Sequence, residues 1–203
     1  GLALNLKLKT DIPVGLLALK GARIITMQDD LVIENGTILI KDNKIQAIGN
    51  ASEINIPEDA KVIDVAGKTI MPGMVDVHAH LRPSPDGVSP QQDWSYLANL
   101  SFGVTTAHDP STNTEMVFSQ AEMIKAGRMV GPRMYSTGSI LYGADGDFKV
   151  VINSVEDALS HLKRLKAVGA FSVKSYNQPR RNQRQQILEA ARQLNMLVVP
   201  EGG

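Results

Sequence analysis

The chain has 203 residues and carries 21 basic and 21 acidic side chains, so its formal net charge at pH 7 is zero. This balance gives no electrostatic reason to expect a nucleic-acid or membrane-surface partner. The sequence contains no cysteine, which excludes disulfides and thiolate ligands. A metal site would therefore have to use histidine, carboxylate or modified lysine side chains. No apolar stretch approaches the roughly 20 residues that a membrane-spanning helix needs.

Residues 1–15 open with leucines that alternate with other residues over Gly1–Lys9. This alternation is typical of a β-strand. The stretch lacks the basic start and the long apolar core of a secretory signal peptide. We interpret residues 1–15 as a linker or as a remnant strand of a preceding domain.

Residues 16–70 predict a small β-sandwich domain. The expected strands are 16–27, 37–40, 44–48 and 61–65, and turns are expected at Asn35–Gly36 and Asp42–Asn43. This region shows no pattern that indicates chemistry. We assign it a scaffolding role.

Residues 71–203 show a different pattern, in which short apolar strands alternate with helical segments. The expected strands are 74–77, 104–107, 133–136, 170–173 and 196–199, and the expected helices are 91–100, 115–126, 154–169 and 183–194. Ser154, with Asp157 three residues later, predicts a capped start of the third helix. Such alternation predicts an α/β fold with a parallel sheet built from βαβ units. Five strands cannot close a (β/α)8 barrel of about 250 residues. The expected fold is therefore an incomplete (β/α)8 barrel, and a doubly wound open sheet is the alternative.

Two histidines, His78 and His80, directly follow the predicted strand over residues 74–77. Alternate residues of a strand face the same side, so the two imidazoles should project together, with Asp76 on the same face. Two neutral imidazoles on one face form half of a site for a divalent transition metal. The alternative is a pair of histidines without a ligand role.

Further polar side chains stand at or near the carboxyl ends of the predicted strands, where α/β folds bind ligands. They are Arg82, His108, Asp109, Tyr142, Lys174, Tyr176 and Glu201. Asp109 is expected to cap the helix that follows it. Lys174 is unusual in this set, because an ammonium would repel a cation. It either lies away from the metal or carries a modification that makes it an anion.

The chain resembles the metal-dependent amidohydrolase superfamily in three segments, Asp64–His80, Gly103–Asp109 and Val173–Lys174. It is most similar to the imidazolonepropionase and Xaa-Pro dipeptidase-like branch, including members fused behind a β-propeller. The resemblance covers only the N-terminal part of a complete member, so residues 71–203 would be the N-terminal part of the hydrolase barrel. A preceding propeller would account for the alternating strand at the start of the chain.

The resemblance implies a binuclear metal site. His78 and His80 would bind the more buried metal, and Lys174 would be the carboxylated lysine that bridges both metals. Glu201 stands where the family usually has a histidine ligand. The metals would be two zinc ions, although manganese, iron and cobalt also suit such ligands. The aspartate that accepts a proton in the family would lie beyond Gly203, so we expect the chain by itself to lack a general base and to be inactive.

The implied reaction is hydrolysis of an amide or another C–N bond in a small molecule, such as an amide, a dipeptide or a lactam. Substrate contacts are assigned to Arg82, His108, Tyr142 and Tyr176. His108 could instead satisfy backbone groups at its strand end, and Arg82 could be solvated.

Two other functions remain open. A mononuclear deaminase of the same superfamily would not need Lys174, and a non-catalytic scaffold or binding protein would tolerate Glu201 in place of histidine. Exposed edges of an incomplete barrel predict either a homo-oligomer or a missing C-terminal part of the barrel.

Overall fold

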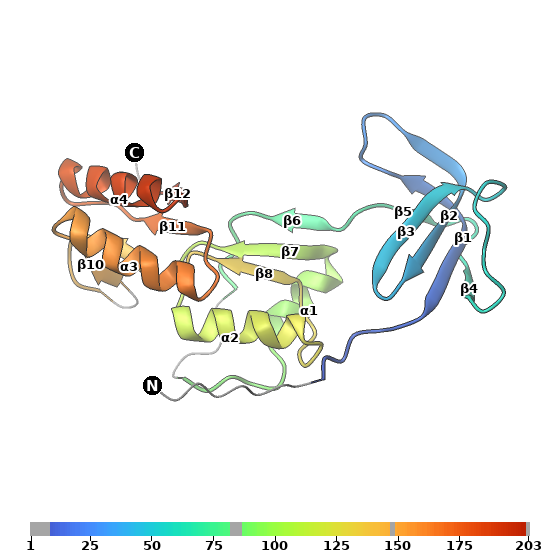
Figure 1. Ribbon diagram of the computed structural model, residues 1–203, viewed down its shortest axis with the longest axis horizontal. Helices are drawn as coiled ribbons and strands as arrows, with labels where there is room; N and C mark the ends of the chain where they lie inside the picture. Colours follow the sequence, from blue (N-terminus) through green and yellow to red (C-terminus); the bar gives the residue numbers. More distant parts are fainter. Residues whose placement is uncertain (1–8, 82–86, 147–148, 202–203) are drawn as a thin grey trace. The chain divides into compact units, whose positions relative to one another are not determined.

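The computed structural model describes residues 9–81, 87–146 and 149–201 (Figure 1). The chain divides into two compact units, Gly1–Gly73 and Met74–Gly203. The first unit is rich in β-strands, and the second combines parallel strands with helices. The predicted α/β fold class is confirmed.

A five-stranded sheet forms the first unit. Its strands are β1 (Leu16–Ile25), β2 (Val32–Lys41), β3 (Lys44–Asn50), β4 (Lys61–Asp64) and β5 (Thr69–Ile70). The order is β3-β2-β1-β4, and β5 also pairs with β1. The pairs β1–β2 and β2–β3 are antiparallel, whereas β4 and β5 run parallel to β1. The core of this unit is built around Ala22, Ile24 and Ile38.

The predicted turn at Asn35–Gly36 is wrong, because both residues lie inside β2. Gly36 pairs with Ala22 across the sheet, and a Cβ on Gly36 would overlap Cδ1 of Ile24. Glycine is therefore needed at this position for close packing and not for a turn. The predicted turn at Asp42–Asn43 is confirmed, since both residues have positive φ angles of 48° and 65° between β2 and β3.

Two parallel sheets form the framework of the second unit. The first contains β6 (Met74–Asp76), β7 (Val104–Asp109) and β8 (Arg133–Ser136), in that order. The second has the order β10-β9-β11-β12, with β9 (Ile140–Tyr142), β10 (Lys149–Val151), β11 (Ser172–Ser175) and β12 (Leu197–Pro200). The five predicted strands are present as β6, β7, β8, β11 and β12. The strands β9 and β10 were not predicted.

In the described part of the second unit, four helices cover these strands, in the predicted places. They are α1 (Trp94–Ser101), α2 (Thr114–Lys125), α3 (Val155–Ala167) and α4 (Arg181–Gln193). The hydroxyl of Ser154 accepts a hydrogen bond of 3.0 Å from the N–H of Asp157, which confirms the predicted cap of α3. The cap of α2 is Asn113, so the prediction that Asp109 caps this helix is wrong. No helix in the described ranges is both long and apolar enough to cross a membrane.

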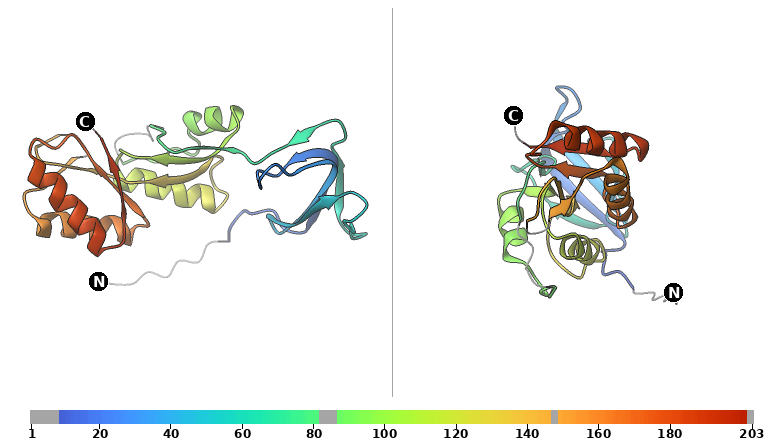
Figure 2. Two further views of the ribbon diagram at one scale, coloured as in Figure 1. Left: turned by 90° about the horizontal axis from the view of Figure 1, so that it is seen from above. Right: turned by 90° about the vertical axis from the view of Figure 1, so that its left-hand side faces the viewer.

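Each sheet of the second unit turns one face to an apolar core. One core gathers Tyr96 of α1 and Val117 of α2 around Ala107 of β7. The other places Leu162 of α3 and Ile187 of α4 against Val173 of β11, and the two helices lie side by side (Figure 2). Since side chains alternate along a strand, the neighbours of these core residues point to the opposite face. That face carries His108 of β7 and Lys174 of β11, two residues of the candidate site.

Candidate functional site

The two histidines that follow β6 lie together. The ring centroids of His78 and His80 are 5.1 Å apart, and the ring planes meet at 72°. Ala79, which stands between them, is buried in the core, so the histidines point away from it. Asp76 accepts a hydrogen bond of 3.0 Å from the backbone N–H of His78 and thereby stabilises the turn at the end of the strand.

Asp109, at the end of β7, connects this turn to the next loop. Its side chain is almost completely buried, and its two carboxylate oxygens accept hydrogen bonds from the N–H groups of Leu81 (3.2 Å) and Ser111 (3.0 Å). Burial raises the pKa of Asp109 to about 6, although these two N–H groups favour the charged form. Its Oδ1 lies 3.9 Å from Nδ1 of His80, and the hydroxyl of Ser111 lies 3.4 Å from the same nitrogen. The carboxylate therefore fixes the backbone beside His80.

His108 precedes Asp109 and points to the opposite face of β7. Its Nε2 lies 2.8 Å from the hydroxyl of Ser172 in β11, and its ring centroid lies 5.5 Å from that of Phe171. Burial lowers the pKa of His108, while a hydrogen bond to the backbone of Val77 acts in the other direction. The imidazole thus links β7 to β11 and to the segment that carries His78.

Lys174 and Glu201 form an ion pair at the ends of β11 and β12. Nζ of Lys174 lies 2.5 Å from Oε2 of Glu201. The lysine side chain is fully buried, whereas that of Glu201 is 38% exposed. Despite the short distance, Nζ of Lys174 makes no hydrogen bond of acceptable geometry within the part of the chain that the structure describes. A buried ammonium without a hydrogen bond is costly, so this side chain calls for a physical explanation.

Lys174 also lies close enough to His108 and Asp109 to act on them electrostatically. The positive charges of His78 and Lys174 both lower the pKa of His108, after the larger effect of burial, and both favour the charged form of Asp109. Across residues 9–81, 87–146 and 149–201, no three His, Asp or Glu side chains gather closely enough to hold a metal ion. A metal site built from the residues predicted for it would therefore need Lys174 as a ligand.

The two tyrosines predicted to contact substrate meet at the ends of β9 and β11. The ring centroids of Tyr142 and Tyr176 are 5.4 Å apart, and the rings are nearly perpendicular at 83°. Nζ of Lys149 lies 4.9 Å from both ring centroids. Sequence reasoning missed Lys149, which belongs to no motif. Arg82, also predicted to contact substrate, lies outside the described residues.

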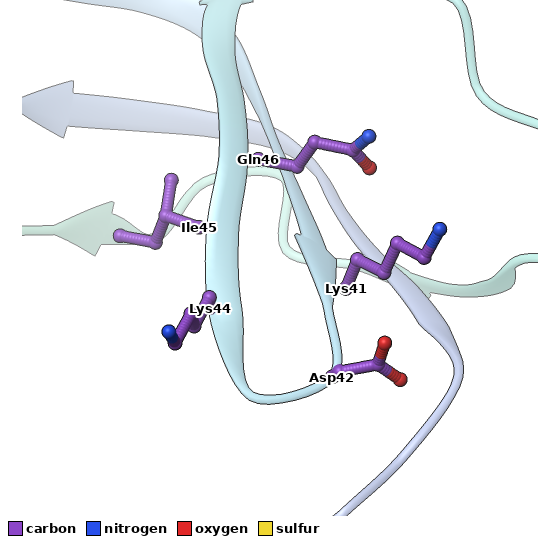
Figure 3. A pocket seen from close by; sticks show the side chains of 5 residues that line it. All are labelled: Lys41, Asp42, Lys44, Ile45 and Gln46. Carbon is purple, nitrogen blue, oxygen red and sulfur yellow. The ribbon is translucent and has the colours of Figure 1, made fainter.

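A surface hollow of about 420 Å³ lies in the first unit, at the turn between β2 and β3. It is lined by Lys41, Asp42, Lys44, Ile45 and Gln46, whose side chains spread around the hairpin (Figure 3). Asp42 uses its Oδ1 to accept a hydrogen bond of 2.9 Å from the N–H of Gly15. None of the predicted site residues belongs to this hollow, so the candidate site remains at the strand ends of the second unit.

No protein-family model matches the chain. Over 67 residues it is 45% identical to a dihydroorotase of Caldicellulosiruptor saccharolyticus, which covers 33% of this chain and 15% of that protein. Over 64 residues it is 41% identical to an imidazolonepropionase of Vibrio cholerae, which covers 30% of this chain and 15% of that protein.

Among solved structures, a prolidase in complex with N-methylphosphonate-L-proline matches 92% of this chain with a TM-score of 0.73. The sequence identity is 21%, so this likeness shows the fold alone. The chain spans 56% of the length of that prolidase and a smaller share of the two enzymes matched by sequence.

Proposed function

Because the chain belongs to the amidohydrolase superfamily, we propose that it forms part of a metal-dependent hydrolase that cleaves an amide or another C–N bond. The substrate would be a small amide, dipeptide or lactam. The observation that carries the proposal is the buried Nζ of Lys174, which lacks a hydrogen bond, lies 2.5 Å from Oε2 of Glu201 and acts electrostatically on His108. The proton acceptor expected beyond Gly203 stays a prediction.

Carboxylation of Lys174 would remove the cost of burying its ammonium. Carboxylation proceeds from the neutral amine form of a lysine, which is the form that reacts with CO2. In this reaction Nζ bonds to the carbon of CO2 and releases one proton, so the side chain becomes an anion with two oxygen atoms. These oxygens would lie beside the carboxylate of Glu201, which is 2.5 Å from Nζ. Two adjacent anions, one of them on a fully buried side chain, would favour a bound cation, and divalent metals fit this requirement.

Four side chains would hold the metals in this proposal. His78 and His80 would bind one ion, the carboxylated Lys174 would bridge to a second, and Glu201 would complete the set. Bound divalent ions would lower the pKa of a coordinated water from 15.7 toward about 7 and polarise the substrate carbonyl. Zinc suits these ligands, as do manganese, iron and cobalt.

The other residues of the site would orient these ligands. Asp109 holds the N–H groups of Leu81 and Ser111, which keeps the backbone next to His80 in place. His108 contacts Ser172, two residues before Lys174 on the same face of β11. Ligands that are held in this way lose less freedom when a metal binds.

Metal analysis of the purified chain tests the proposal. We expect zinc to be retained after desalting, and a carbamate signal to appear in ¹³C NMR spectra when ¹³C-labelled bicarbonate is supplied. Lys174→Ala should lose the carbamate signal and most of the metal. Lys163→Ala is the matched control, because Lys163 is exposed on α3 and should change neither.

Two outcomes would contradict the proposal in different ways. A folded chain that binds no metal would remove its basis. A Lys174→Ala variant that keeps one metal and deaminates a substrate would favour the mononuclear deaminase instead.

A further inference from the structure

The cluster of Tyr142, Tyr176 and Lys149 lies on the same side of its sheet as Lys174. Val173 and Leu141 belong to the core under α3 and α4, so the next residues, Lys174 and Tyr142, point to the opposite face. Tyr176 follows Lys174 by two residues, and its N–H donates a hydrogen bond of 3.3 Å to the carbonyl oxygen of Leu141. Both tyrosines thus stand at the carboxyl ends of strands, where substrates bind in this type of fold.

The strand register and a glycine place Lys149 in this cluster. Lys149 is opposite Ile140 in the parallel pair of β10 and β9, two residues before Tyr142. Its backbone N–H donates to the carbonyl of Gly146 (3.2 Å), and a Cβ on Gly146 would lie 2.6 Å from Cδ of Lys149. The side chain therefore runs close past Gly146, where a Cβ would force it to shift, and its ammonium lies 4.9 Å from the centroids of two aromatic rings.

The ammonium of Lys149 still has hydrogen-bonding capacity in this position. No carboxylate of the described residues forms an ion pair with it. An ammonium carries three donors, and contacts with two ring faces leave at least one of them for a ligand. A single positive charge beside aromatic rings suits a singly charged, planar anion, and an ammonium binds such an anion through charge-assisted hydrogen bonds.

We propose that Lys149, held between the rings of Tyr142 and Tyr176, binds a carboxylate group of the substrate. The inference rests on the proposed function for placing this cluster in the substrate site. It narrows the substrate to an amide that carries a carboxylate away from the bond to be cleaved, such as an N-acyl amino acid.

Binding of a matched pair of small ligands tests this inference. The probes are N-acetylglycine and its neutral analogue N-acetylglycinamide, which have no side chain that could clash. They are titrated separately into isotope-labelled, metal-free chain while the NMR signals of the Lys149 side chain and of both tyrosine rings are followed. We expect saturable shifts with N-acetylglycine and affinity for it about tenfold or more above that for the amide, as a charge-assisted hydrogen bond provides.

Variants locate the binding. Lys149→Met should abolish the preference for the carboxylate, and Lys149→Arg should keep part of it. Lys44→Met, which removes one exposed lysine charge from the first unit, should change nothing. Equal binding of both probes, no saturable binding, an unchanged preference in Lys149→Met, or stronger binding of inorganic phosphate than of N-acetylglycine would each overturn the inference. Since no metal or turnover is needed, failure here is distinguishable from failure of the proposed hydrolase function.

Discussion

Replacing Gly36 with alanine should destabilise the first unit. The new Cβ would overlap Cδ1 of Ile24 and lie 2.9 Å from its Cγ1 and 3.2 Å from Cγ2 of Ile33. Ile24 is only 2% exposed, so its side chain has little room to move away. Overpacking of this kind costs about 1–3 kcal/mol. Alanine also makes the unfolded chain less flexible than glycine does, which stabilises the fold by about 0.4–1 kcal/mol. The net loss of stability is therefore about 1–2 kcal/mol.

A double-mutant cycle isolates the contact responsible. Ile24→Val removes Cδ1, the atom that the new methyl group would overlap, and by itself should cost about 0.5–1.5 kcal/mol. In the presence of Gly36→Ala the same truncation relieves the overlap. The loss of stability in the double mutant should therefore be about 1 kcal/mol smaller than the sum of the losses in the two single mutants.

Hydrogen exchange read by mass spectrometry is the suitable assay, because residues 1–73 contain no Trp, Tyr or Phe that could serve as an optical probe. Peptides from β1 and β2 should lose protection in Gly36→Ala. Gly49→Ala in β3 is the matched control, since its methyl group would meet the end of the half-buried Ile54 side chain at 3.1 Å. Equal loss in both variants, or strict additivity with Ile24→Val, would refute the packing argument.

Two further predictions concern the second unit. Gln183 is fully buried, accepts a hydrogen bond from the N–H of Arg180 and donates to the carbonyl of Ile152, so Gln183→Ala should lower the free energy of unfolding in urea by about 2–3 kcal/mol. The exposed Gln193→Ala should stay within about 0.5 kcal/mol of the wild type, and an equal effect of both would contradict this reasoning. Because the pKa of Asp109 is raised from 3.8 to about 6 in the folded chain, its protonation stabilises the fold as the pH falls between these values. The stability of the metal-free wild type relative to Asp109→Asn should therefore increase from pH 7 to pH 4.5, and a difference independent of pH would exclude the buried carboxylate as its source.

The sequence predicted those features that depend on local patterns. Alternation of strands and helices identified the framework of the second unit, and the spacing of Ser154 and Asp157 identified the start of α3. His78 and His80 were recognised as a pair because side chains two residues apart lie on the same face of a strand. Each of these signals lies within a few residues of the feature it predicts.

The features that were missed depend on distant contacts. Asn35–Gly36 has the composition of a turn, but packing against Ile24 keeps it inside a strand. Asp109 does not cap a helix, and its carboxylate instead accepts a hydrogen bond from the N–H of Leu81, 28 residues earlier. Lys149 acquires its position only through pairing of β10 with β9. None of these contacts leaves a trace in a short window of sequence.

The opposite orientation of His108 and Asp109 limits how the length of β7 can vary during evolution. The imidazole of His108 makes its contacts on one face of the strand, and the carboxylate of Asp109 makes its contacts on the other. A substitution at either position removes one set of contacts. Loss or gain of a single residue upstream in β7 would exchange the two faces and disrupt both sets at once. Insertions and deletions should therefore be far rarer in this strand than in the loops on either side of it.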